Sequence, residues 1–405
     1  PDCLDRRVLH HDNQGFHPSF LDYLSTFEFK GTILSATEGE LIFPNEPVLS
    51  VRGNLIESQI IETLLLNTIN FESLIATKAS RICYAAKGKS ILDFGLRRAQ
   101  GWGGLQASKA AIIGGVQGTS NVLSGMQEDI PVSGTMAHSW IQSFEDELTA
   151  FRAYARHYPD DTVLLVDTYN TLESGIPNAI QVAHELERAS HRLKAIRLDS
   201  GDLAYLSKKA RTMLDEAGLS YVGIAASNQL DEHLIRSLDE QEAPIDFFGV
   251  GTKLVTAYDH PALDGVYKLS EVNGEAKLKI SDNVEKITLP GVKNVTRYYG
   301  GDGMMICDGI SLASETEHHT IHHPLYPAKF TNVSAYQPES LLKLVVDRGR
   351  RIANLPTALQ SQAYASKQLA RLNPEHKRFD NPHVYKVGVS KPLIELRDNL
   401  ITSFS

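Results

Sequence analysis

Four short apolar segments between residues 163 and 250 end in polar or glycine residues that could do chemistry. At or next to these ends lie Asp167, Arg197, Asp199, Ser227, Asn228, Gly251 and Thr252. In a parallel α/β barrel the carboxyl ends of the strands converge on one face, where the catalytic groups lie. We therefore expect these side chains, although distant in sequence, to form one site.

Two of these residues belong to the motif Arg-Leu-Asp-Ser-Gly-Asp at 197–202. An Asp pair suits a ribose diol or a divalent metal, and a guanidinium suits a planar anion. The alternative is that Asp202 is only a helix N-cap and that Arg197 and Asp199 form a surface pair. The strand-end position of Asp199 beside Arg197 favours a functional role.

A histidine follows another predicted strand end, in the motif Ser-Gly-Thr-Met-Ala-His-Ser at 133–139. The pKa of imidazole lies near physiological pH, so His138 could act as a nucleophile or a general base. The alternative is a helix-capping Thr135 with a buried, hydrogen-bonded histidine. Spacing alone does not separate the two interpretations.

Two further groups could bind anions. Hydroxyl, amide and glycine backbone groups at Ser227, Asn228, Gly251 and Thr252 suit a phosphate, although a Gly-Val-Gly alone is more often a turn. The motif at 93–98, Asp-Phe-Gly-Leu-Arg-Arg, could stack an aromatic ring on Phe94 and clamp anions with Arg97 and Arg98. The alternative there is a core Phe with two surface arginines.

The histidine-rich stretch at 317–323 resembles a metal site only in composition. Its residues fall in a predicted loop and lack the regular spacing of a tetrahedral site. We predict no metal bound directly by protein ligands alone.

The elements that must position these residues read as alternating short strands and amphipathic helices. Helices are predicted at 178–192, 203–217 and 230–238, and further strands at 90–94 and 130–135, with 112–117 a weaker candidate. Six or seven such units favour an incomplete α/β barrel over an open sheet. A doubly wound sheet stays open as an alternative, because strand order cannot be read from one sequence.

The flanks have a different pattern and predict a second domain. Short strand-like segments with glycine-rich turns occur near both ends of the chain, and closing helices are predicted at 355–372 and 390–400. We expect residues 1–77 and 266–405 to form one strand-rich sandwich domain. Residues 78–265 then form the barrel domain that carries the site.

Composition limits the class of protein. The net charge of −9 argues against general nucleic-acid binding, which needs a basic surface. No apolar run approaches the roughly 20 residues of a membrane span. The three cysteines form no CxxC pair, which fits a reducing cytoplasm better than a disulfide framework. No signal peptide is visible, and Pro1 is an unusual first residue, so we expect the natural N-terminus to lie upstream.

With these motifs in order, the chain resembles the nicotinate phosphoribosyltransferase family over nearly its whole length. The matching stretches are residues 94–101, 118–123, 134–139, 197–203, 226–228, 248–252 and 285–291. Their order and spacing make the resemblance more specific than any single motif.

The resemblance implies a fold and an activity. The family joins nicotinate to 5-phosphoribosyl 1-diphosphate, giving nicotinate mononucleotide and diphosphate for NAD biosynthesis, with Mg²⁺ and coupled ATP hydrolysis. Its fold is an incomplete α/β barrel with a sandwich domain built from both ends of the chain. The resemblance also implies a cytoplasmic homodimer that binds small molecules and neither nucleic acid nor membrane.

The resemblance further implies roles for particular residues. His138 corresponds to the histidine that ATP phosphorylates, and Asp167 and Asp199 are expected near ribose and Mg-diphosphate. The residues implied for nicotinate are Phe94, Thr119, Ser120, Thr135 and Arg197, and those for the phosphoribosyl diphosphate are Arg97, Arg98, Ser227, Asn228, Gly251 and Thr252.

Two departures from the family pattern are visible. No Thr-Asp-Leu-Tyr-Gln-like segment, whose Tyr completes the nicotinate stack, precedes Phe20. Asn170 stands where relatives often carry Asp, which puts a metal role at that position in doubt.

Two alternative functions stay open: a pyridine phosphoribosyltransferase for nicotinamide or quinolinate, and a non-catalytic nucleotide-binding relative. Because the turn at 118–121 offers no carboxylate for an amide and Arg197 offers positive charge, the sequence favours the acid over nicotinamide.

Overall fold

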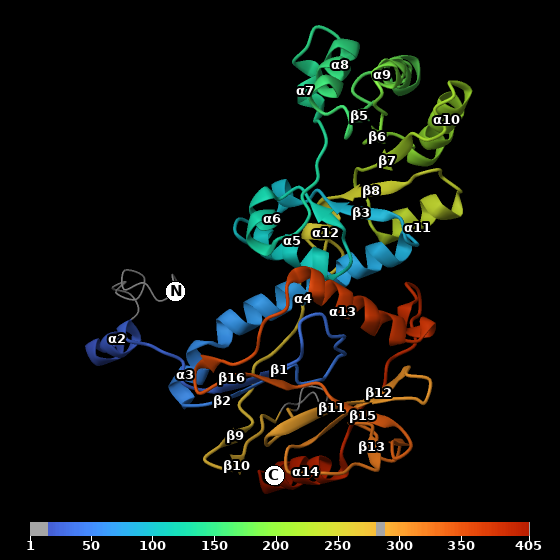
Figure 1. Ribbon diagram of the computed structural model, residues 1–405. Coiled ribbons are helices and arrows are strands. Elements are labelled where there is room, and N and C mark those ends of the chain that lie inside the picture. The colour runs from blue at the N-terminus through green and yellow to red at the C-terminus, as the bar shows by residue number, and fades with distance from the viewer. Residues whose placement is uncertain (1–14, 281–287, 405) are drawn as a thin grey trace. The chain divides into compact units, whose positions relative to one another are not determined.

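A computed structural model describes residues 15–280 and 288–404 of the chain, which divides into two compact units (Figure 1). One unit comprises residues 1–66, 266–355 and 370–405, and the other comprises residues 67–265 and 356–369. The boundary that we expected at 77 falls inside helix α4 (Glu62–Ala85), and most of helix α13 (Ala358–Arg371) belongs to the second unit. Each unit is described by itself below.

Six strands of the described chain form one parallel sheet in the second unit. They are β3 (Ser90–Asp93), β4 (Gly118–Thr119), β5 (Val163–Leu165), β6 (Ala195–Leu198), β7 (Gly223–Ala226) and β8 (Phe247–Val250), in the spatial order β4-β3-β8-β7-β6-β5. Their interiors are almost continuously apolar and buried, as expected for parallel strands covered on both faces.

The order of these strands is that of a ring with one opening. The last strand, β8, pairs with the first, β3, from Ser90 opposite Phe247 to Asp93 opposite Val250. No ladder among the described residues joins β4 to β5, so the ring is open there. This is the incomplete barrel predicted from the sequence, and it excludes the doubly wound alternative, in which first and last strands do not meet.

The helices between the strands are α5 (Gly103–Ile113), α6 (Val122–Glu128), α7 (His138–Gln142), α8 (Glu147–His157), α9 (Ile176–Arg188), α10 (Leu203–Glu216), α11 (Glu232–Glu240) and α12 (Thr252–Val255). Three of these helices, α9, α10 and α11, lie close to their predicted positions, and the other five were not predicted from the sequence. Asp202 caps α10 by accepting the Tyr205 N–H at 3.0 Å. The alternative interpretation of Asp202 as a helix N-cap is therefore confirmed.

Two predicted strands are wrong. Residues 112–117 include the end of α5 and a turn, because Gly114 and Gly115 stop the helix after Ile113. Residues 130–135 contribute only a single bridge, between Val132 and Thr119. Pro131 lacks the N–H that would extend this pairing, so the segment runs beside β4 without joining a ladder.

The first unit is built from both ends of the chain, as predicted. Strands β17 (Arg350–Arg351), β16 (Lys343–Asp347), β1 (Thr32–Ser35) and β2 (Leu49–Arg52) form one antiparallel sheet. A second sheet contains β14 (Phe330–Asn332), β13 (Thr320–His322), β18 (Val387–Val389), β12 (Met305–Leu312), β11 (Lys293–Tyr299) and β15 (Gln337–Ser340). A two-stranded hairpin pairs β9 (Glu271–Val272) with β10 (Glu275–Ala276). Other helices of this unit are α2 (Pro18–Ser25), α3 (Leu55–Ile60) and α14 (Lys391–Ser403).

A buried charge cluster lies in the core of this unit. The Arg297 side chain is fully buried and donates to Asp308 Oδ2 at 2.7 Å and to Glu40 Oε1 at 2.5 Å. Tyr385 Oη donates to Asp308 Oδ1 at 2.9 Å. Burial, together with the neighbouring Asp308 carboxylate, raises the pKa of Glu46 to about 10. Glu46 is therefore an uncharged acid at neutral pH.

Among the helices of the described chain, none is both long and apolar enough to cross a membrane.

Candidate active site

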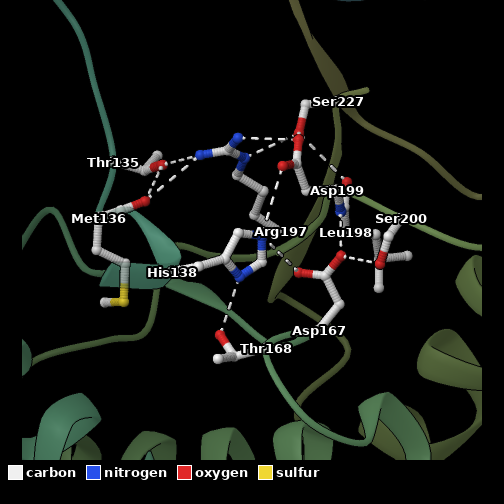
Figure 2. A network of polar contacts seen from close by, with 10 residues as sticks. All are labelled: Thr135, Met136, His138, Asp167, Thr168, Arg197, Leu198, Asp199, Ser200 and Ser227. Carbon is white, nitrogen blue, oxygen red and sulfur yellow. Dashed lines mark hydrogen bonds and ion pairs between the residues drawn. The ribbon is translucent and has the colours of Figure 1, made fainter. Parts of the chain in front are cut away.

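The barrel unit gathers side chains from three neighbouring strand ends and from the segment at the barrel opening (Figure 2). Asp167 lies two residues beyond β5, Arg197 lies in β6 with Asp199 just beyond it, and Ser227 directly follows β7. Thr135 precedes α7 at the opening of the ring. The convergence that parallel strand ends predict is confirmed for these residues.

Arg197 is the hub of the network. Its Nη1 donates to Thr135 Oγ1 at 2.7 Å, its Nε donates to Ser227 Oγ at 2.9 Å, and its Nη2 donates to Asp199 Oδ1 at 3.0 Å. Nη1 also lies 3.5 Å from the Met136 carbonyl oxygen. Because its partners come from three different segments, the guanidinium is held in one orientation before any ligand binds.

An aromatic ring lies against this guanidinium. The Cζ atom of Arg197 is 5.4 Å from the ring centroid of Phe94, which is within cation–π range. Phe94 directly follows β3, and its N–H donates to the Val250 carbonyl at 2.8 Å, which fixes the backbone at the β3–β8 closure. Gly249 leaves room for the ring, since a Cβ there would lie 2.5 Å from two Phe94 ring atoms.

His138 begins α7 and presents its two ring nitrogens to different partners. Nδ1 lies 3.1 Å from Thr168 Oγ1. Nε2 faces two carboxylates, 3.5 Å from Asp199 Oδ2 and 3.9 Å from Asp167 Oδ1. The side chain is 39% exposed, so a reactant can reach the ring.

Asp167 is the most buried carboxylate of the site, with a side chain only 1% exposed. Its Oδ2 accepts the Asp199 N–H at 2.9 Å and the Ser200 hydroxyl at 2.5 Å. Its Oδ1 is buried and has no hydrogen-bond partner within the described structure. Because a buried, unpaired carboxylate oxygen is unfavourable, this atom marks a position for a cation or a proton donor.

Asp199 is ionised at neutral pH. Burial alone would raise its pKa, but the Arg197 charge and the hydrogen bonds from Ser227 and Arg197 outweigh burial and lower the pKa of Asp199 below its ordinary value. His138 adds a smaller effect in the same direction. The site therefore combines a fixed cation, an aromatic face, an ionised carboxylate and an accessible imidazole.

The structure turns Thr119, one of the predicted nicotinate residues, away from this network. Thr119 is fully buried, and its hydroxyl donates to Asp93 Oδ2 at 2.7 Å, where Ser108 Oγ also donates at 3.0 Å. The N–H of Ser120 donates to the Asp93 carbonyl at 2.9 Å, and its side chain is half-buried. The Thr119 hydroxyl thus supports the turn that follows β3, and a role at nicotinate for either residue stays a prediction.

The predicted anion-binding residues other than Ser227 lie at or near strand ends but form no hydrogen bond or ion pair with the network in the described structure. Arg97 and Arg98 are exposed on a short 3₁₀ turn (Leu96–Arg98), and no carboxylate of the described chain pairs with them. Asn228 is exposed with φ of 85°, and Thr252 starts the short helix α12. Gly251 is closer to the network, because a Cβ there would meet the Phe94 carbonyl oxygen at 3.1 Å.

Sequence reasoning missed two residues that hold the site together. Thr168 contacts His138, and Ser200 donates to Asp167. Both directly follow a carboxylate at a strand end, and that adjacency was the available signal. Asn170 has a structural role, because its Oδ1 caps a π-helical turn (Thr171–Gly175) by accepting the Leu172 and Glu173 N–H groups at 3.2 and 3.0 Å.

Within residues 15–280 and 288–404, no group of three or more His, Cys, Asp or Glu side chains is placed to hold a metal ion by itself. In the histidine-rich stretch, His323 Nδ1 accepts the N–H groups of Leu325 and Tyr326 at 3.1 and 3.2 Å, which stabilises a turn. The matching stretch at 285–291 and the region before residue 15 lie partly or wholly outside the described residues, and so does Cys3.

Three family models match the chain in sequence order. The nicotinate phosphoribosyltransferase N-terminal domain matches residues 5–70, the nicotinate phosphoribosyltransferase family matches residues 89–303, and the C-terminal domain of the same enzymes matches residues 292–397.

Individual relatives agree with these matches. The nicotinate phosphoribosyltransferase of Bacillus subtilis is 44% identical, over 94% of this chain and 79% of its own length. That of Dictyostelium discoideum is 38% identical, over 94% of this chain and 75% of its own. The crystal structure of human nicotinic acid phosphoribosyltransferase superposes with a TM-score of 0.84 at 31% identity, covering 97% of this chain and 87% of the human one.

Proposed function

This chain belongs to the nicotinate phosphoribosyltransferase family, and we propose that nicotinate is joined to 5-phosphoribosyl 1-diphosphate at the mouth of its barrel. It is an enzyme of NAD biosynthesis by salvage that acts on small molecules. The observation that carries the assignment of the site is the Arg197 guanidinium, held against the Phe94 ring by Thr135, Ser227 and Asp199.

Nicotinate is a planar anion, and it suits this pair of groups. Its ring stacks on Phe94 and its carboxylate pairs with Arg197, which also receives support from the Thr135 hydroxyl. Nicotinamide brings no charge to Arg197 and leaves its partly buried guanidinium less well paired. A lost charge-assisted hydrogen bond of this kind is worth about 1.5–3 kcal/mol. The site therefore discriminates in favour of the acid.

Transfer of the ribosyl group places positive charge on the sugar ring as the bond to diphosphate breaks. Asp199 is ionised and fixed by Arg197, so it stabilises that charge without reorganising. The pyridine nitrogen attacks the ribose carbon from the position that Phe94 and Arg197 give to nicotinate. Arg97 and Arg98, exposed and without carboxylate partners in the described chain, neutralise the departing diphosphate.

For the proposed coupling to ATP, His138 is the residue that accepts the γ-phosphoryl group, and ADP is the leaving group. Its ring is accessible, and its nitrogens are directed by Thr168 on one side and by Asp199 and Asp167 on the other. The carboxylates orient the ring and stabilise it when it carries positive charge. Phosphorylation then changes the charge beside Asp199, which alters affinity for the ribose diphosphate.

Mg²⁺ fits the oxygen atoms that this site leaves available. Mg²⁺ prefers carboxylate oxygens combined with water and substrate phosphates. Asp167 Oδ1 is buried without a hydrogen-bond partner, and Asp199 Oδ2 lies on the same side of His138, so these two residues would hold the ion together with diphosphate oxygens. When bound, the ion supplies neutralisation of the leaving group.

We also propose a cytoplasmic homodimer. Cys83 and Cys307 are free thiols, in keeping with a reducing compartment. Large apolar side chains at the start of α5 and on α6 are exposed, with Trp102 at 81% and Met126 at 78%, and a second copy of the chain would cover them. Light scattering after gel filtration should give the mass of a dimer, and Met126→Asp should lower it.

The test of the catalytic assignment compares three bases. Purified enzyme with 5-phosphoribosyl 1-diphosphate, Mg²⁺ and ATP should use nicotinate with kcat/KM about 10-fold to 10²-fold above that for nicotinamide. Quinolinate should give no product, because the single cation at Arg197 leaves its second carboxylate unpaired. Equal use of nicotinate and nicotinamide would contradict this view of the pocket, and binding of mononucleotide without any diphosphate release would identify a non-catalytic relative.

A further inference from the structure

Ser227 is placed differently from a phosphate-binding serine. The residue is only 3% exposed, and its hydroxyl lies between Arg197, Asp199 and the Leu198 carbonyl. It accepts the Arg197 Nε–H at 2.9 Å and donates to Asp199 Oδ1 in a short hydrogen bond. The single hydroxyl proton of Ser227 is already donated and the side chain is buried, so the hydroxyl makes its hydrogen bonds within the protein (Figure 2). The hydroxyl is thus bound to Arg197 and Asp199, and the sequence-based assignment of Ser227 to the 5-phosphate stays a prediction.

The position that Ser227 takes on the guanidinium is specific. An arginine usually binds a nearby carboxylate with two parallel hydrogen bonds, one to each oxygen. Here the Nε–Nη2 edge of Arg197 binds two different groups: Nη2 binds Asp199 Oδ1 at 3.0 Å, and Nε binds Ser227 Oγ. The serine hydroxyl therefore occupies the place that the second carboxylate oxygen would take.

The consequence falls on the other oxygen of Asp199. Because Arg197 holds only Oδ1, Oδ2 is left to point across the site, 3.5 Å from His138 Nε2. If both oxygens were bound to Arg197, Oδ2 would turn toward the guanidinium and away from His138, and each oxygen would have fewer lone pairs left for the reacting groups. The Arg197 guanidinium would also neutralise more of the negative charge of the Asp199 carboxylate.

We propose that Ser227 is a positioning residue that blocks bidentate pairing between Arg197 and Asp199, and so keeps one Asp199 oxygen directed at the reaction centre. The proposal rests on the proposed role of Asp199 at the ribose. In this arrangement Arg197 orients Asp199 and faces nicotinate, and it binds only one of the two Asp199 oxygens. The other oxygen is available for the transfer step.

The experiment removes the hydroxyl and follows nicotinate transfer. Ser227→Ala should lower kcat by at least roughly tenfold while KM for nicotinate changes by less than about threefold, because Arg197 keeps Thr135 and Phe94. Ser227→Cys keeps a side chain of similar size in this place, so it should still block the second oxygen and should lose less activity than Ser227→Ala. The matched control is Ser207→Ala, since Ser207 is also buried but its hydroxyl binds only the Ala204 carbonyl within α10.

A double-mutant cycle separates positioning from a general structural effect. In the Asp199→Asn background, Ser227→Ala should change kcat by less than about twofold, because the group it positions has already lost its charge. Equal losses in both backgrounds would overturn the proposal. Full activity in both Ser227 variants, measured beside an active unmodified enzyme, would also overturn the proposal.

A crystal structure of Ser227→Ala provides a readout independent of turnover. We expect Asp199 Oδ2 within about 3.2 Å of Arg197 Nε, the distance of an ordinary hydrogen bond. An Asp199 that keeps its present single contact would refute the inference even if the activity were low. If the unmodified enzyme shows no nicotinate transfer at all, the proposed function fails, and this structure still decides whether Ser227 blocks the bidentate pair.

Discussion

Replacing Gly249 with alanine should displace the Phe94 ring beneath Arg197. Gly249 lies inside β8, where its lack of a side chain leaves the space that the ring fills. A Cβ built there would lie 2.5 Å from two ring carbons, whereas ordinary contact begins at 3.4 Å. The ring must therefore move by about 0.9 Å, since β8 is held on both sides by its ladders to β3 and β7.

The size of the functional effect follows from that displacement. A misplacement of about 1 Å in a group that orients a substrate can lower the rate by about 10²-fold. The strain of inserting one methyl group into a packed site costs about 1–3 kcal/mol of stability, which a two-domain enzyme tolerates. We therefore expect a folded Gly249→Ala enzyme with kcat/KM for nicotinate lowered by about 10²-fold, largely through KM, because nicotinate loses its stacking surface.

Initial rates at varied nicotinate concentration measure this effect, with thermal unfolding as the check on folding. Gly223→Ala in β7 is the matched control, because a Cβ there has no neighbour closer than 3.4 Å. It should leave kcat/KM within about twofold. A Gly249→Ala enzyme with the rate of the unmodified protein would refute the assignment of Phe94 as the surface on which nicotinate stacks.

Three further changes test separate parts of the structure. His138→Ala should abolish acid-labile label from γ-labelled ATP and leave some uncoupled transfer, because the ring that faces Asp199 is gone; label that persists on histidine would rule out the assignment. Asp199→Asn keeps the shape but removes the charge, so kcat should fall by about 10²-fold with a smaller change in KM; an unchanged kcat would leave Asp199 with a structural role only. Glu46→Gln should flatten the pH dependence of stability. Burial and Asp308 raise the pKa of Glu46 to about 10, so its contribution is complete below about pH 4.5 and is lost as pH rises toward 10. Unfolding by denaturant at pH 5 and pH 8 should therefore show a smaller loss in the variant than in the unmodified protein, and an equal loss would contradict a protonated Glu46.

The convergence of the site could be predicted from the sequence because one geometric rule covers it. Parallel strands end on the same side of a sheet, so Asp167, Asp199 and Ser227, each at the end of an apolar segment, had to lie close together. The helices α9, α10 and α11 were predictable for an equally local reason, since their apolar periodicity and caps such as Asp202 are visible in the sequence.

The direction of individual side chains could not be predicted. Thr119 lies in a strand of two residues, too short for alternation to show which face is buried, and its hydroxyl points to Asp93 instead of the site. The bond between Ser227 and the Nε of Arg197 depends on the spacing between two strands and leaves no trace in either strand's sequence. Pro131, by contrast, did carry a signal against the predicted strand at 130–135, since it cannot donate to a ladder.

The closure of the barrel also bears on the order in which the chain can fold. Ser90 pairs with Phe247, so one of the two neighbours of β3 is the most distant strand of the barrel in sequence. Closing so long a loop costs conformational entropy before the stabilising contacts between the two strands form. Such pairings therefore form late and slowly during folding. The backbone N–H of Phe94 donates to the Val250 carbonyl in the last strand, whereas Asp167, Arg197 and Asp199 are positioned by β5 and β6, which are consecutive in sequence. The charged half of the active site can therefore form during synthesis before the aromatic half, and the surface proposed for nicotinate is completed only when β8 joins β3.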